Sequence, residues 1–216
     1  MFVLTVDQRH SRREPDRIEG LLSRLPTRDE TFLRPFERTA GDEVQGILDR
    51  PEDVVSLTLA LVREDTWSIG IGAGPVKHPL PPSTRAGSGP AFILARDAVT
   101  RAKSRPSGVV VIGTGAQTTR HAQAVLDLLA AVAARRTPLG WEAVDLAAGG
   151  LNQVEIAARL QVSKQAVSQR LRAAEWHLEP DGRALAVHLL SVADAPTMSE
   201  ADATTMSVAG ATVVAP

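Results

Sequence analysis

The chain has 216 residues, of which 44% are hydrophobic, so it can form one large domain or two small ones and is not wholly disordered. It contains no cysteine, which excludes disulfides, thiolate nucleophiles and cysteine-ligated metal centres. Its 24 Lys and Arg nearly balance its 25 Asp and Glu, so any surface that binds nucleic acid has to be local. No apolar run approaches the roughly 18 residues of a membrane helix, and no signal peptide is evident, which predicts a cytoplasmic protein without membrane contact.

The first part of the chain alternates short strands with helices. Strands are expected over residues 2–6, 32–39, 43–48, 67–76 and 109–112, and helices over 16–25, 51–63 and 91–103. In residues 67–76, Ile and Gly alternate, which indicates a strand that another element approaches closely. The order β-α-β-β-α-β-α-β is typical of an α+β domain of ferredoxin-like or palm type, and we expect this domain to span residues 1–116.

The character of the chain changes after residue 118, where helical patterns follow one another without strands. Helices are expected over residues 121–136, 139–148, 152–160, 163–178 and 183–192. They predict an all-α domain over residues 117–194. Residues 195–216 are rich in Ala, Thr, Ser and Val without a clear period, and we expect a disordered tail there.

Residues 151–174 read LNQVEIAARLQVSKQAVSQRLRAA and have the pattern of a helix-turn-helix. The residues expected to be buried are Val154, Ile156, Ala157 and Leu160 on the first helix and Val167 and Leu171 on the second. Val162 is the expected apolar plug between the helices, and Ser163 is a natural N-cap for the second. The alternative is a plain helical hairpin with a polar outer face.

The second helix of this motif carries donors and acceptors but no carboxylate on its outer face, which suits a groove walled by phosphates. The candidate DNA-binding residues here are Ser163, Lys164, Gln165, Ser168, Gln169, Arg170 and Arg172. Asn152 and Gln153 begin the first helix, where backbone N–H groups can face a phosphate. The stretch resembles the helix-turn-helix of sigma-factor region 4 and of LuxR-type proteins. This resemblance implies that Lys164, Gln165, Ser168 and Gln169 face base edges.

Two acids of the first domain stand where strands end. Asp7 follows the first strand, and Asp42 lies in the turn of the expected hairpin, next to Glu43. Two such carboxylates can converge on a divalent cation, and bound metal ions support phosphoryl transfer. The alternative is that each acid is simply solvated, as most acids in turns are.

Three motifs of this domain resemble those of nucleotide cyclases. Residues 38–44 (RTAGDEV) resemble the hairpin of class III nucleotidyl cyclases and of GGDEF diguanylate cyclases. Residues 69–74 (IGIGAG) resemble the strand that follows in both, and residues 89–96 (GPAFILAR) resemble the next element. As a set, the motifs most closely resemble the SatD family. This resemblance implies a cyclase-like palm domain over about residues 1–115.

The resemblance also implies a site. Asp7 and Asp42 match the metal-binding acids, so the implied cofactor is Mg²⁺ with a nucleotide. Arg38 matches a base-contacting lysine, and Arg96 matches an arginine that contacts the triphosphate or stabilises the transition state. A phosphate can in addition be held by Arg9, Arg12 and Arg13, which follow Asp7. The sequence departs from the cyclases at Phe92, where they have Asn, and this departure argues against turnover more than against binding.

These observations predict a DNA-binding transcriptional regulator that binds double-stranded DNA as a homodimer. Its helix-turn-helix would read the major groove, and its cyclase-like domain would dimerise, sense a nucleotide-type ligand, or do both. We expect no catalytic residues. The alternative is a metal-dependent, nucleotidyl cyclase-like enzyme that its helical domain regulates. The helix over residues 121–136 is a candidate for the dimer contact.

Overall fold

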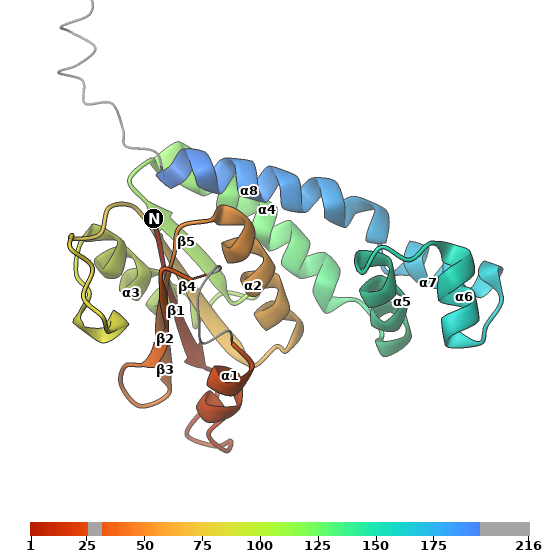
Figure 1. The fold of residues 1–216 in the computed structure, drawn as a ribbon, viewed down its shortest axis with the longest axis horizontal. Coiled ribbons are helices and arrows are strands. Elements are labelled where there is room, and N and C mark those ends of the chain that lie inside the picture. The colour runs from red at the N-terminus through yellow and green to blue at the C-terminus, as the bar shows by residue number, and fades with distance from the viewer. Residues whose placement is uncertain (26–31, 195–216) are drawn as a thin grey trace, which may run out of the picture.

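The computed structural model describes residues 1–25 and 32–194 of the chain. Within these residues the fold is α+β, with one five-stranded mixed sheet and eight α-helices (Figure 1). The expected tail over residues 195–216 lies outside the described residues.

The elements follow the predicted order along the chain. The first part contains β1 (Phe2–Gln8), α1 (Ile18–Arg24), β2 (Arg34–Arg38), β3 (Glu43–Leu48), α2 (Pro51–Arg63), β4 (Trp67–Ala73), the 3-10 turn η1 (Thr84–Ala86), α3 (Pro90–Ala102) and β5 (Val109–Gly113). The second part contains α4 (Ala116–Ala134), α5 (Pro138–Ala148), α6 (Gln153–Leu160), α7 (Lys164–Ala173), the 3-10 turn η2 (Trp176–Leu178) and α8 (Glu179–Asp194). Every expected strand and helix is therefore present, with ends that differ by a few residues.

Three predicted helix boundaries are wrong. The helix expected over residues 163–178 ends at Ala173, because Glu175 takes a left-handed backbone with φ 51°. The chain then forms η2 and starts α8 at Glu179, earlier than the predicted start at 183. At the third boundary, α4 begins at Ala116 rather than at 121, because the extended backbone of Gly115 already provides its N-cap.

The sheet has the strand order β2-β3-β1-β4-β5, with β1 in the middle. β1 runs antiparallel to β3 and β4, β2 antiparallel to β3, and β4 parallel to β5. Alternation along β1 directs Phe2 and Val6 to the face covered by α1, α2, α4 and α8. Val3 and Asp7 have the opposite parity and belong to the face covered by α3.

The glycines of β4 let α3 lie directly on the sheet, as the alternation of Ile and Gly predicts. A Cβ atom on Gly70 would stand 2.2 Å from the backbone nitrogen of Val99, and one on Gly72 would stand 2.1 Å from the carbonyl oxygen of Ala91. No side chain fits into such a gap. The end of α3 and the loop after it are therefore held close to the carboxyl end of β1 and to the start of β4, which lies beside it.

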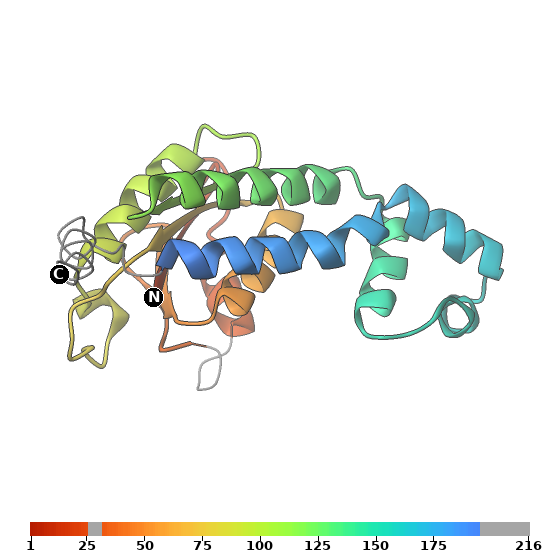
Figure 2. The same ribbon diagram turned by 90° about the horizontal axis from the view of Figure 1, so that it is seen from above.

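Helices α4 and α8 lie side by side and extend from the sheet to a smaller group of helices (Figure 2). Their buried residues, such as Leu126 and Leu190, belong to the same hydrophobic core as the sheet. Helices α5, α6 and α7, here called the helical lobe, have a separate core around Val144, Ile156 and Val167. The helical domain expected over residues 117–194 thus shares its two longest helices with the sheet, and the division after residue 116 stays a prediction.

Candidate nucleic-acid interface and basic pocket

The turn between α6 and α7 is built as the sequence predicts. Gln161 ends α6 in a left-handed backbone with φ 54°, and Val162 packs half-buried against the core of the lobe. Ser163 N-caps α7, since its hydroxyl accepts a hydrogen bond of 3.1 Å from the backbone N–H of Ala166. The predicted cap and plug are therefore confirmed.

The buried residues of the motif match the prediction with one exception. Ile156, Ala157, Val167 and Leu171 are buried, and Leu160 is half-buried. Val154, which we expected in the core, is 60% exposed. It lies two residues from Ile156, and two residues turn the helix by about 200°, so Val154 faces away from the core.

The polar face of α7 points to solvent. Lys164, Gln165, Gln169 and Arg172 are exposed, Ser168 is half-buried, and no carboxylate lies on this helix. Arg170 is turned toward α5, where it forms an ion pair of 3.4 Å with Glu142. The structure thus brings together most of the predicted recognition residues and diverts Arg170 from them.

The first helix of the motif begins with a capping box. The Oδ1 atom of Asn152 accepts hydrogen bonds from the backbone N–H groups of Val154 and Glu155, at 2.9 and 3.2 Å. Glu155 in turn accepts from the backbone N–H of Asn152 at 2.8 Å. These backbone N–H groups already have partners, so Asn152 would contact a phosphate through its side-chain NH₂ group. The neighbouring Gln153 is half-buried.

Two arginines attach the helical lobe to the rest of the chain. Arg63 at the end of α2 forms two hydrogen bonds with Asp145 of α5, at 2.7 and 3.0 Å. Arg136 is buried, pairs with Glu179, and donates from Nε to the carbonyl oxygen of Ala174 just after α7, at 2.8 Å. Both guanidinium groups stack on the ring of Trp141, 4.2 and 4.7 Å from its centre. None of these contacts was predicted from the sequence.

A pocket of about 820 Å³ opens at the carboxyl end of β1. It is lined by the loop after β1, the hairpin turn at Asp42, and the loop over residues 103–106 that follows α3. Asp7, Asp42 and Arg9, all predicted site residues, share this pocket with Arg12 and Arg13. We call it the basic pocket, because Lys103 and Arg105 also line it.

Asp7 forms an ion pair on the floor of the basic pocket. Its carboxylate is almost fully buried and accepts a hydrogen bond of 2.7 Å from Nζ of Lys103. In the sheet it stands between Glu43 of β3 and Ser68 of β4. Burial raises the pKa of Asp7, and the nearby carboxylates of Asp42 and Glu43 raise it further, although Lys103 partly opposes them.

Two other predicted site residues lie outside the lining of this pocket. Arg38 donates to the carbonyl oxygen of Gly41 at 2.6 Å and pairs with Asp16 at 2.6 Å, so it fastens the hairpin turn to the segment before α1. The hydrogen bonds from the backbone N–H of Ile18 and from Arg38 hold the pKa of Asp16 below its usual value. Arg96 is exposed on α3, and Lys103, two turns further along, reaches the pocket instead.

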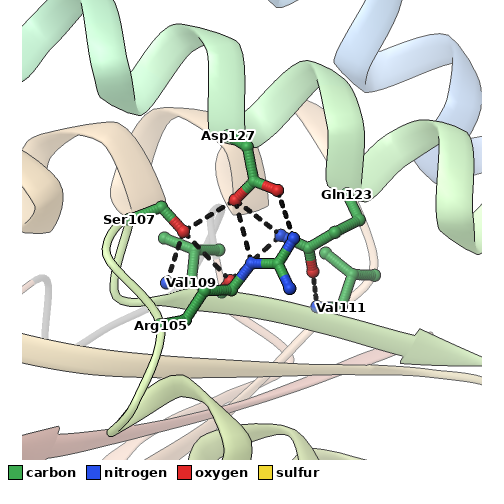
Figure 3. A network of polar contacts seen from close by, with 6 residues as sticks. All are labelled: Arg105, Ser107, Val109, Val111, Gln123 and Asp127. Carbon is green, nitrogen blue, oxygen red and sulfur yellow. Dashed lines mark hydrogen bonds and ion pairs between the residues drawn. The ribbon is translucent and has the colours of Figure 1, made fainter.

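A hydrogen-bond network connects the basic pocket with α4 (Figure 3). Arg105 forms an ion pair with Asp127 of α4, to which Ser107 also donates, at 2.7 Å. Gln123 bridges α4 to β5, accepting from the backbone N–H of Val111 at 2.8 Å and donating to the carbonyl oxygen of Val109 at 3.0 Å. The loop after α3 is therefore fixed between β5 and α4 by side chains that the sequence analysis did not single out.

Further observations bear on metals, membranes and relatives. In residues 1–25 and 32–194, no three His, Asp or Glu side chains are grouped so that they could hold a metal ion. No helix in this part of the chain has the length and apolar character needed to cross a bilayer. Comparison of the chain with protein-family models, with curated proteins and with solved structures gives no match.

Proposed function

We propose that the chain is a DNA-binding transcriptional regulator that inserts α7 into the major groove of double-stranded DNA. The observation that carries this proposal is the outer face of α7, where Lys164, Gln165, Gln169 and Arg172 are exposed without an acid among them. Gln can pair bidentately with adenine, and Lys can contact guanine or a phosphate. A helix with this face, capped by Ser163, has the surface that a recognition helix needs.

The position of α7 supports the same proposal over a plain helical hairpin. Val167 and Leu171 hold α7 to the core of the helical lobe by one side only. The lobe itself extends beyond the sheet, where α4 ends and α8 begins (Figure 2). A recognition helix has to approach the DNA without a collision between the duplex and the rest of the protein, and the extended position of the lobe favours such an approach.

We infer that the sheet domain is a ferredoxin-like, cyclase-like palm that serves dimerisation, ligand sensing or both. The order β2-β3-β1-β4 with antiparallel neighbours supports the ferredoxin-like assignment, and β5 extends that sheet on one edge. A homodimer would present two recognition helices to half-sites about 34 Å apart. Leu128 of α4 and Leu185 of α8 are 68% and 48% exposed, which makes these two helices the candidate dimer contact.

The alternative function is a metal-dependent, nucleotidyl cyclase-like enzyme. It is favoured by the presence of Asp7 and Asp42 in the same pocket. It is disfavoured by Phe92, which stands where cyclases have Asn and is buried in the core between α3 and the sheet. Measurable turnover of ATP or GTP that Asp42→Ala abolishes would establish the enzyme.

The test is to select binding sites from sheared genomic DNA with the purified full chain at two salt concentrations. Phosphate contacts alone give retention that collapses as salt rises, whereas base contacts leave a set of enriched sites. We expect enriched inverted repeats that survive the higher salt concentration. Uniform retention that disappears with salt would contradict the proposal.

A double variant then tests the recognition residues. Gln165→Ala with Gln169→Ala should lower the preference for the enriched site by about 1–3 kcal/mol for each lost base contact. The matched control is Gln117→Ala, because Gln117 is an exposed glutamine near the start of α4, outside the lobe. Unchanged preference in the double variant would show that α7 is not the recognition helix.

A further inference from the structure

The charge of the basic pocket points to an anion. Five Lys and Arg line it against two acids, although the whole chain carries a net charge of only −1. Arg12 and Arg13 are exposed and have no ion-pair partner in the part of the chain that the structure describes. A concave site with an excess of one sign of charge concentrates ions of the opposite sign.

Lys103 determines how such an anion can be held. Its Nζ stands 2.7 Å from the carboxylate of Asp7, the acid that the sequence matches to a metal ligand. The ammonium group already neutralises this carboxylate and has further N–H groups to donate. A divalent cation at Asp7 would be repelled by the ammonium group of Lys103, whereas an anion can bind to Lys103 where it stands.

The pocket also contains polar atoms without partners. Ser68 is fully buried beside Asp7, and its hydroxyl has no hydrogen-bond partner among the described residues. The Nε atom of Arg9 is likewise buried and unpartnered. Buried polar atoms without partners are rare in folded proteins, and here both belong to residues that line a pocket with five Lys and Arg side chains.

We propose that the basic pocket binds a phosphate group of a small phosphorylated molecule directly through Arg12, Arg13 and Lys103, without a divalent cation. Charge-assisted hydrogen bonds from Arg and Lys are the usual means of holding phosphate. A pocket of about 820 Å³ is of the size that takes a small molecule rather than a lone ion. The proposal deepens the ligand-sensing part of the proposed function, but it does not depend on DNA binding.

Titration calorimetry of the full chain with pyrophosphate, and separately with ATP, in buffer that contains EDTA tests this site. We expect binding in EDTA that Mg²⁺ does not strengthen. Arg12→Ala with Arg13→Ala should weaken it by about tenfold or more, the effect of losing charge-assisted hydrogen bonds. The matched control is Arg101→Ala, because Arg101 lies near the end of α3, pairs with Asp97, and does not line this pocket.

The variant Asp7→Asn distinguishes an anion site at Lys103 from a metal site at Asp7. If Lys103 is the anion ligand, this change removes a competing negative charge, and pyrophosphate should bind more tightly in EDTA. If Asp7 is a metal ligand, the same change and EDTA should each abolish binding, and the proposal would be overturned. Far-ultraviolet circular dichroism checks that the variant is folded.

Two further results would overturn the proposal. The first is the absence of pyrophosphate and ATP binding in EDTA. The second is displacement of pyrophosphate by a short DNA duplex, since the ligand would then be the DNA backbone. The titrations with pyrophosphate and with ATP in EDTA contain no DNA. A failure of the chain to bind DNA would therefore leave their outcome unaffected.

Discussion

Asp127 is the residue that links the basic pocket to α4, because its carboxylate accepts hydrogen bonds from Arg105 and Ser107 of the loop after α3. Burial raises its pKa, but the hydrogen bonds from Arg105, Ser107 and Gln123 lower it by more, so the pKa lies below its usual value. In the same pair, the hydrogen bond to Asp127 raises the pKa of Arg105. The ionised form of Asp127 therefore stabilises the fold.

The pH dependence of this contribution has a definite sign. An acid whose pKa is lower in the folded chain stabilises it fully above the unfolded pKa, about 3.9 for Asp, and loses this effect as pH falls through the folded value. We expect Asp127→Asn to lower the free energy of unfolding at neutral pH by about 1–3 kcal/mol, the value of a charged hydrogen bond. Urea unfolding should show the difference shrinking as pH falls below about 4.

Asp97→Asn is the control for this measurement. Asp97 pairs with Arg101 four residues along the exposed side of α3, and such pairs contribute only about 0.3–0.5 kcal/mol. Equal losses in the two variants, or a loss in Asp127→Asn that does not change with pH, would contradict the role given to Asp127.

At the level of single residues, local patterns could be predicted and distant partners could not. Ser163 and Val167 have roles that neighbours within a few residues determine, a cap and a helix face, and both are confirmed. The partner of Asp7 is Lys103, 96 positions away, and only the packing of α3 on the sheet brings the two together. The alternation of residues along β1 predicts on which face of the sheet Asp7 lies, but it does not predict which side chain pairs with Asp7 there.

At the level of elements, β4 shows how a sequence pattern sets the distance between layers. Its glycines admit the backbone of α3, so the spacing between α3 and the sheet leaves no room for a Cβ atom at Gly72. The elements themselves were predictable from their periodicity. The ends of α4 and α7 were not, because a left-handed residue and an extended glycine can stop or start a helix wherever tertiary packing favours it.

Gly72→Ala tests this spacing. Its Cβ atom would stand 2.1 Å from the carbonyl oxygen of Ala91, so α3 would have to move, and we expect a loss of about 1–3 kcal/mol in unfolding free energy. The control is Gly20→Ala in α1, where a Cβ atom meets nothing within 4 Å. There, a gain of about 0.5–1 kcal/mol is expected from helix propensity. A Gly72→Ala variant as stable as the parent would show that α3 does not need this contact.

For the whole molecule, the important question is how the helical lobe is joined to the sheet. Helices α4 and α8 reach from the core of the sheet to the lobe, and the buried pair of Arg136 with Glu179 lies where α4 ends and α8 begins. From the sequence, a domain boundary was predicted after residue 116, because the change from strands to helices is visible there. The actual sharing of α4 and α8 depends on contacts between segments far apart in the chain.

The two arginines of this joint allow a matched comparison. Arg136→Met removes the buried cation of Glu179 and leaves only the partly exposed Arg183, 2.6 Å away, so a loss of about 1.5–3 kcal/mol in unfolding free energy is expected. Arg63→Met also removes a cation from the ring of Trp141, but its partner Asp145 is half exposed, so a loss of about 1 kcal/mol or less is expected. Urea unfolding followed by tryptophan fluorescence measures both. Similar losses would mean that stacking on Trp141, rather than the pair with Glu179, holds the lobe in place.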